Sequence, residues 1–231
     1  MIHTLVLASG NRSKLLEIRA LLAGLPVKVV GMDEVLRPPP VVVEDGATFA
    51  DNAAKKARAV AAAALCLTLA DDSGLEVDAL DGRPGVRSAR FAHERATDAE
   101  NNAALVAALE STFDPSGPSD AHAYLARFRC ALCLVDPYGN RGTGEVAVAE
   151  GVCEGAITLA ARGSFGFGYD PLFVVAGRER TMAELSEEEK NAVSHRARAC
   201  LALRPVLERM LAAREAVVRA VERGAEGVAT A

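Results

Sequence analysis

Residues 3–23 read HTLVLASGNRSKLLEIRALLA, and this stretch already indicates the class of fold. Its first six residues, His3 to Ala8, are mostly apolar and are typical of a short buried strand. From Arg12 to Ala23, leucine and isoleucine recur at three- and four-residue spacing, which predicts a helix that ends at Gly24. The chain therefore opens with a strand, a turn and a helix, the building unit of α/β proteins.

The rest of the chain continues this alternation of strands and helices. We predict strands at residues 27–31, 67–70, 124–135 and 144–152, and helices at residues 48–64, 97–110 and 187–223. The strand at 67–70 is expected to stop at Asp71, and the last helix to bend near Pro205. Residues 114–120 are predicted to form a loop and residues 224–231 a frayed tail. We expect one α/β domain over residues 1–231, with two lobes and a C-terminal extension from about residue 212.

Composition excludes several classes of protein. The chain has 26 Lys and Arg against 31 Asp and Glu, a formal charge of −5, whereas binding to nucleic acid by bulk charge needs a basic domain. The longest uncharged run, between Arg58 and Asp71, is about twelve residues, well short of the roughly twenty that cross a bilayer. Because the first ten residues lack the pattern of a secretory signal, we expect a cytoplasmic protein with no nucleic-acid or membrane partner.

The five cysteines are an odd number with no zinc-like pairing, so reduced and mostly buried thiols are expected at Cys66, Cys130, Cys133, Cys153 and Cys200. Cys130 and Cys133 have the spacing of a redox motif, but they lie in a predicted strand, where positions three apart point to opposite faces. A reactive thiol also needs a helix N-terminus to lower its pKa. Structural thiols are therefore favoured over redox chemistry.

The turn after the first strand has the composition of an anion-binding loop. It reads Ser9-Gly10-Asn11-Arg12-Ser13-Lys14, so backbone N–H groups and the positive end of the helix dipole point to one place. Gly10 lets a ligand approach the backbone closely, and Lys14 can reach back over a phosphate. The spacing is not that of a Walker loop, and an ordinary capped turn is the alternative interpretation.

Adjacent carboxylates, Asp71 and Asp72, follow the apolar run at residues 67–70. Two neighbouring carboxylates disfavour double ionisation unless a cation neutralises them. Oxygen ligands without a His or Cys cluster favour Mg²⁺ over zinc, and Glu44 is a third candidate ligand. Mg²⁺ usually combines one or two carboxylates with substrate phosphates, which agrees with a nearby anion loop. Alternatively, these residues only form turns and caps.

Residues 166–171 read Gly-Phe-Gly-Tyr-Asp-Pro in a chain that is only 4% aromatic. Flat rings flanked by glycine can lie against a purine or pyrimidine, so Phe167 and Tyr169 predict a platform for a base. A tight turn that covers the edge of the core is the alternative.

Residues 190–196 gather cationic and hydrogen-bonding groups near the start of the last predicted helix. Arg196 can donate a forked pair of hydrogen bonds to a carbonyl or a phosphate, which lysine cannot reproduce. A solvated helix face is the alternative interpretation. Taken together, the anion loop, the carboxylates, the aromatic platform and the cationic donors describe a nucleotide site.

Six motifs, in this order, resemble those of the inosine triphosphate pyrophosphatase family, whose members are also called XTP/dITP diphosphatases. They are S-G-N-x-x-K at 9–14, E-x-G-x-T-F-x-x-N-A-x-x-K-A at 44–57, A-D-D-S-G-L at 70–75, P-G-V-x-S-A-R at 84–90, G-F-G-Y-D-P at 166–171 and A-E-L-S-x-E-E-K-N-x-x-S-H-R at 183–196. The resemblance implies a mixed α/β fold, with two lobes around a long central sheet and a nucleotide cleft between them. It also implies a homodimer and Mg²⁺-dependent hydrolysis of ITP, dITP and XTP to monophosphate and pyrophosphate, which removes these deaminated nucleotides from the pool.

The resemblance also assigns roles to residues. Those assigned to the triphosphate are Ser9, Gly10, Asn11, Arg12, Ser13 and Lys14. Glu44 and Asp72 are assigned to the metal, with Asp71 as a further ligand or a support for one; Asp72 is the proton acceptor and Ser73 a substrate contact. The residues assigned to the base and sugar, with Phe167 stacking, are Phe167, Gly168, Tyr169, Asp170, Lys190, His195 and Arg196. Arg196, which only donates, suits the six-oxygen of hypoxanthine or xanthine better than the amino group of adenine.

Two positions depart from the family pattern, because Asp51 stands where glutamate is usual and Asp45 where threonine is usual. The loop at 114–120 and the segment after Leu211 receive no function. A Maf-like pyrophosphatase for modified pyrimidines is the alternative enzyme, but the S-x-R-R segment expected after the first strand is absent. A nucleotide- or RNA-binding module without catalysis is disfavoured by the charge of −5.

Overall fold

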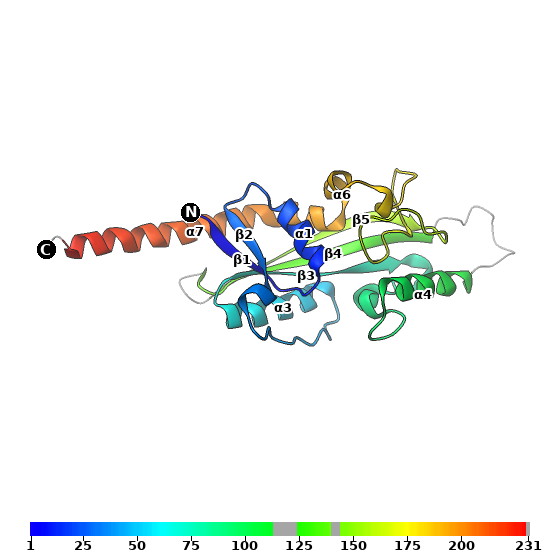
Figure 1. Cartoon of the computed structure of the whole chain (residues 1–231), viewed down its shortest axis with the longest axis horizontal. Coiled ribbons are helices and arrows are strands. Elements are labelled where there is room, and N and C mark those ends of the chain that lie inside the picture. The colour runs from blue at the N-terminus through cyan, green and yellow to red at the C-terminus, as the bar shows by residue number, and fades with distance from the viewer. Residues whose placement is uncertain (113–123, 140–143, 230–231) are drawn as a thin grey trace.

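The computed structural model describes residues 1–112, 124–139 and 144–229, and a six-stranded sheet in the order β2-β1-β3-β4-β5-β6 forms its centre (Figure 1). The strands are β1 (His3–Leu7), β2 (Val27–Gly31), β3 (Leu67–Val77), β4 (Tyr124–Asp136), β5 (Glu145–Ile157) and β6 (Phe173–Val175). β1 pairs in parallel with β2 and β3, and the remaining pairs are antiparallel. The sheet is therefore mixed, as the resemblance implied.

Helices cover both faces of the sheet and define two lobes. The described α-helices are α1 (Arg12–Leu21), α2 (Met32–Val35), α3 (Phe49–Ala64), α4 (Asp98–Glu110), α6 (Glu187–Val193) and α7 (His195–Ala229). α1 and α7 bury Ile18 and Leu203 against one face, and α3 buries Ala57 against the other. A separate apolar core around Leu105 of α4 and Phe173 of β6 fills the second lobe. In Figure 1, α3 lies below the sheet, α1 and α6 lie above it, and α4 lies at the end far from the termini. The predicted two-lobed α/β fold is confirmed.

β3 is longer than the sequence pattern predicts. The expected end at Asp71 is wrong, because β3 pairs with β4 from Thr68 opposite Val135 to Val77 opposite Ala126. β1, in contrast, ends at Leu7, which lies opposite Leu69 of β3. The loop that follows β1 therefore lies beside the middle of β3, where Asp71 and Asp72 are placed.

The last predicted helix is two helices. Ser194 is extended and separates α6 from α7, and its hydroxyl accepts a hydrogen bond from the backbone N of Ala197 at 3.2 Å. A serine hydroxyl in this position caps a new helix, which explains the break. α7 then contains Pro205 and continues to Ala229, so the tail predicted from residue 224 is helical up to that point. The predicted loop at 114–120 lies outside the described residues.

The described part of the chain contains neither a disulfide nor a membrane-spanning helix. All five cysteines are free, and Cys130 and Cys133 join the apolar cores on opposite faces of the sheet, as predicted. Burial raises the pKa of the Cys133 thiol to about 11. Within the described part of the chain, no helix combines the length and the apolar character needed to cross a membrane.

Candidate active site

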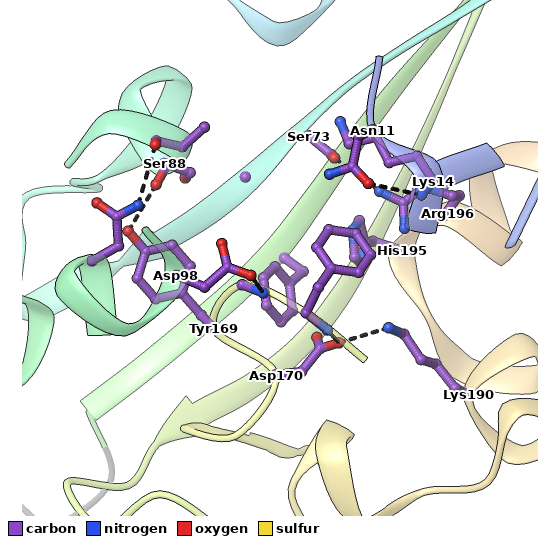
Figure 2. Close-up of a pocket in the computed structure, with 16 residues that line it drawn as sticks. Asn11, Lys14, Ser73, Ser88, Asp98, Tyr169, Asp170, Lys190, His195 and Arg196 are labelled. Carbon is purple, nitrogen blue, oxygen red and sulfur yellow. Dashed lines mark hydrogen bonds and ion pairs between the residues drawn. The ribbon is translucent and has the colours of Figure 1, made fainter. Parts of the chain in front are cut away.

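Two adjoining pockets lie along β3, and they share Asn11, Lys14, Ser73 and Ala89 in their walls. We name the one that contains Glu44, Lys56 and Asp72 the carboxylate pocket, and the one that contains Phe128, Phe167 and His195 the aromatic pocket. Figure 2 shows the aromatic pocket, with Lys14, Ser73 and Arg196 on one side and Asp98 and Tyr169 on the other. Its walls come from both lobes.

The predicted anion loop is preserved in the structure. Asn11 caps α1, because its side-chain oxygen accepts from the backbone N of Ser13 at 2.9 Å and of Lys14 at 3.1 Å. A Cβ placed on Gly10 would meet no protein atom within 4 Å, so the space in front of this residue is open to a ligand. Ser9, Gly10, Asn11 and Lys14 line the carboxylate pocket, whereas Arg12 and Ser13 line neither pocket.

On one face of β3, Asp72 points toward α3. Lys56 of α3 donates to Asp72 Oδ1 at 2.6 Å and to Glu44 Oε2 at 3.0 Å, and Asn52, one turn earlier, approaches Asp72 Oδ2 at 3.4 Å. Asn52 and Lys56 share a helix face because they are four residues apart. Burial raises the pKa of Asp72 to about 6, although the Lys56 ammonium pulls it down. The arrangement provides a carboxylate that can accept a proton near neutral pH.

On the other face of β3, Asp71 points toward α1 and α7. It is completely buried and accepts from Lys14 Nζ and from Arg196 Nε, the second at 2.8 Å. Burial alone would raise the pKa of Asp71, but the Arg196 and Lys14 cations hold it well below its usual range. Because Asp71 and Asp72 are neighbours in a strand, they point to opposite faces. Asp71 is therefore turned away from Glu44, and of its two suggested roles this geometry favours support of the site over direct ligation of a metal.

Arg196 is held by the protein on all three guanidinium nitrogens. Nε donates to Asp71, Nη1 to Glu17 and Nη2 to Ser73 Oγ at 3.0 Å. The side chain is 1% exposed and its Cζ lies 5.6 Å from the centre of the Phe167 ring. The sequence predicted a free fork for a base; the structure shows a guanidinium fixed by three partners at the wall of the aromatic pocket.

The loop at 166–170 shapes the aromatic pocket. Asp170 Oδ2 accepts from the backbone N of Phe167 at 3.0 Å and from Lys190 Nζ at 2.6 Å. Gly166 has a φ of +78°, and a Cβ there would lie 2.0 Å from Asp170 Oδ2, so only glycine allows this turn. The Gly168 backbone N donates to Asp98 Oδ2 at 2.7 Å. The half-buried Phe167 ring is thereby presented to the pocket with Lys190 Nζ 5.1 Å from its centre.

Tyr169 and His195 are buried, in contrast to the half-buried Phe167. Tyr169 belongs to the apolar core of the second lobe and its hydroxyl donates to the Ser88 carbonyl at 2.9 Å, so it is a fixed part of the pocket wall, whereas Phe167 is the more exposed ring of the predicted pair. His195 stacks on Phe128 with ring centres 4.8 Å apart. Burial and the nearby Arg196 lower the pKa of His195 well below its usual value, so its ring is neutral. Among the described residues, its Nδ1 has no hydrogen-bond partner.

Several residues at the site were missed by the sequence analysis: Glu17, Asn52, Lys56, Asp98 and Asn101. Asn52 and Lys56 stand in the second quoted motif and could have been found from their spacing four residues apart on a predicted helix. The others lack a local signal, because only the tertiary fold brings them to the pockets.

The two departures from the family pattern have structural explanations. Asp51 accepts from the backbone N of Thr48 at 3.2 Å and from its hydroxyl at 2.8 Å, so it completes the predicted capping box of α3. Asp45 accepts from Lys55 Nζ at 2.5 Å at the surface. Neither carboxylate lines the two pockets.

The carboxylate pocket has a donor set that fits Mg²⁺. Glu44 and Asp72 offer hard oxygen ligands, and both already surround one cation, the Lys56 ammonium. No cluster of three or more His, Cys, Asp or Glu side chains that could hold an ion occurs in residues 1–112, 124–139 and 144–229. Mg²⁺ suits such a site because it takes one or two carboxylates and completes its coordination with water and substrate phosphates.

The protein is of the α/β class, with helices on both faces of a mixed sheet. Its carboxylate and lysine cluster beside an aromatic pocket suits a nucleotide. The chain belongs to the Ham1 family, whose model matches residues 5–206. A dITP/XTP pyrophosphatase of Desulforamulus reducens is 47% identical over 208 residues, covering 89% of this chain and 96% of the relative. A dITP/XTP pyrophosphatase of Geobacter sulfurreducens is 48% identical over 200 residues, covering 87% and 94%. The solved structure of a HAM1 protein from Coxiella burnetii has a TM-score of 0.76 and 41% identity, covering 90% of this chain and all of that one.

These comparisons confirm the predicted family, the fold and the class of enzyme, since the relatives are named as pyrophosphatases of nucleoside triphosphates. The family match ends at residue 206, whereas α7 continues to Ala229. The C-terminal extension is thus the later part of one helix that begins inside the matched region.

Proposed function

We propose that this chain hydrolyses deaminated purine nucleoside triphosphates, namely ITP, dITP and XTP, to the nucleoside monophosphate and pyrophosphate, with Mg²⁺ as cofactor. The reaction removes these nucleotides from the pool. The names of the Desulforamulus and Geobacter relatives support the dITP and XTP part of this proposal.

The observation that carries the proposal is that two pockets of different chemistry meet at Asn11, Lys14 and Ser73. A nucleoside triphosphate has a flat base at one end and a polyanion at the other. The aromatic pocket, with Phe167 in its wall, suits the base, and the carboxylate pocket suits the phosphates and their counterion. One substrate therefore spans both pockets.

The charged side chains of the carboxylate pocket divide the tasks of hydrolysis among them, and Asp72 takes two of these tasks. The Lys14 and Lys56 ammonium groups and the anion loop neutralise phosphate charge, which otherwise repels an attacking water. Asp72, held by Lys56 and Asn52, accepts the proton of that water while the anhydride bond to pyrophosphate breaks. Glu44 and Asp72 would hold Mg²⁺, which when bound supplies positive charge at the phosphates.

The aromatic pocket selects the base. Phe167 offers a ring face for stacking, and Lys190 and Arg196 border it with donors only. A six-oxygen accepts from such donors, whereas the six-amino group of adenine would be left facing them unpaired. We therefore expect hypoxanthine and xanthine to be preferred over adenine. Guanine also carries a six-oxygen, so these donors do not select against it, and the exclusion of GTP expected below needs another contact.

The test is pyrophosphate release from ITP, dITP, XTP, GTP, ATP and a pyrimidine triphosphate, each measured with Mg²⁺ and with a chelator. We expect fast, metal-dependent release from ITP, dITP and XTP only. Release from the pyrimidine triphosphate would instead indicate the Maf-like alternative, and no release from any nucleotide would indicate a binding protein. The homodimer, the cytoplasmic location and the single domain over residues 1–231 stay predictions.

A further inference from the structure

Asp71 is a completely buried carboxylate that the proposed reaction does not use. Four side chains donate to it: Lys14 Nζ, Arg196 Nε at 2.8 Å, Ser73 Oγ at 3.0 Å and Cys130 Sγ at 3.2 Å. Lys14 belongs to the anion loop and Arg196 borders the aromatic pocket. A single carboxylate thus contacts a cation of the anion loop, where the two pockets meet, and a cation in the wall of the aromatic pocket.

The contacts of Asp71 continue into a longer series of ion pairs. Arg196 Nη1 donates to Glu17, whose second oxygen lies 2.7 Å from Lys190 Nζ. Lys190 Nζ donates in turn to Asp170 Oδ2 at 2.6 Å, a bond drawn in Figure 2, and Asp170 holds the backbone of Phe167. Positive and negative groups therefore alternate without a break from the anion loop to the stacking platform.

Stability alone does not explain a carboxylate at this position. Leu69 and Leu75, on the same face of β3, are both completely buried, so the surroundings accept apolar side chains. Replacing a buried ion pair by well-packed apolar residues is often neutral or stabilising, because desolvation offsets the attraction between the charges. What only the carboxylate supplies is a fixed geometry: it holds two cations at its two oxygens.

We propose that Asp71 is a positioning residue that fixes the Lys14 ammonium and the Arg196 guanidinium relative to each other, so that phosphate binding and base selection depend on one carboxylate. This inference rests on the proposed function. It goes beyond that function because it assigns the link between the two pockets to a residue that contacts neither the base nor the phosphates.

The test compares the wild type with Asp71→Asn at each end of the site. The phosphate end is measured by the Ki of inorganic tripolyphosphate against dITP, and the base end by the ratio of kcat/KM for dITP to that for dATP. We expect the Ki to rise and the ratio to fall, each by on the order of tenfold, the size of one lost charge-assisted hydrogen bond.

Asp136→Asn is the matched control, because Asp136 is also buried and bound to an arginine, Arg214, at 2.6 and 2.7 Å, but lines neither pocket. It should lower the Tm and leave both the Ki and the ratio unchanged. A change at only one end of the site in Asp71→Asn, or at neither end, would overturn the proposed link. Absence of dITP hydrolysis by the wild type would instead contradict the proposed function.

A second pair of variants keeps Asp71 in place and tests the same link should Asp71→Asn not fold. Cys130→Ala removes one donor to Asp71, and Cys130→Ser keeps a hydroxyl donor there. We expect Cys130→Ala to move the Ki and the ratio together by about twofold, and Cys130→Ser to restore both. If the two variants behave alike at both ends, the contact to Asp71 does not position the site and the proposal fails.

Discussion

The two faces of β3 give neighbouring aspartates different chemistry. Asp71 is buried against α1 and α7, where the Arg196 and Lys14 cations outweigh burial and hold its pKa well below the usual range. Asp72 is directed at α3, where burial raises its pKa to about 6 despite Lys56. Two identical side chains one residue apart thus become a permanent anion and a proton acceptor, because a strand alternates its side chains between faces.

The largest expected effect comes from removing the carboxylate that we propose as the proton acceptor, on the α3 face of β3. Asp72→Asn should lower kcat for dITP by roughly a thousandfold, within the range lost with a general base. Binding should persist because asparagine keeps the size of the side chain. The measurement is kcat together with the Kd of a non-hydrolysable dITP analogue. Unchanged turnover in this variant would remove Asp72 from the mechanism.

A smaller effect is expected from the cation on the same face. Lys56→Gln should lower kcat/KM for dITP by about a hundredfold, since glutamine lacks the positive charge that would stabilise the developing phosphate charge. The control is Lys55→Gln, because among the described residues Lys55 pairs only with the exposed Asp45, and it lines neither pocket. Equal losses in the two variants would show a general effect of charge and contradict a specific role for Lys56.

The smallest effect on activity is expected from changing Asp136, a buried aspartate that lies outside the site. Burial alone would raise the pKa of Asp136, but the hydrogen bonds and charge of Arg214, together with backbone N–H groups of Tyr138 and Gly139, lower it. Asp136→Asn should therefore reduce the free energy of unfolding by about 2 to 3 kcal/mol at neutral pH. A carboxyl with a lowered folded-state pKa stabilises above its unfolded pKa of about 4 and loses this contribution as pH falls through the folded value.

The measurement for Asp136→Asn is denaturant unfolding of both proteins across pH. The two curves of stability against pH should converge below about pH 4, where the wild-type carboxyl becomes protonated in both states. A difference that stays constant down to pH 2 would show that the ion pair with Arg214 is not its source.

Much of the site could be predicted from short stretches of sequence. The strand, turn and helix that form the anion loop are local, as are the capping box of Thr48 with Asp51 and the glycine turn around Phe167. Such elements depend on neighbouring residues, so periodicity and capping patterns are sufficient to place them.

The remaining features depend on pairing between distant segments. β3 continues past Asp71 because β4, which is distant in the sequence, pairs with it from Thr68 to Val77. Tyr169 is buried because its ring packs into the core of the second lobe, where its hydroxyl donates a hydrogen bond to the Ser88 carbonyl. The sequence around residue 169 does not indicate either contact. Likewise, the three residues that contact Arg196 all lie more than 120 positions before it in the chain. Sequence patterns cannot predict these contacts because they arise only after the lobes assemble.

The continuity of β4 has a consequence for the mechanical coupling of the two lobes. Val135, near the end of this strand, belongs to the core under α3, and Phe128 of the same strand belongs to the core of the second lobe. The lobes therefore share an unbroken ladder of backbone hydrogen bonds with β3 and β5. β4 is continuous from Tyr124 to Asp136, without a loop that could serve as a hinge. Any rotation of one lobe against the other therefore has to change the twist of the sheet itself.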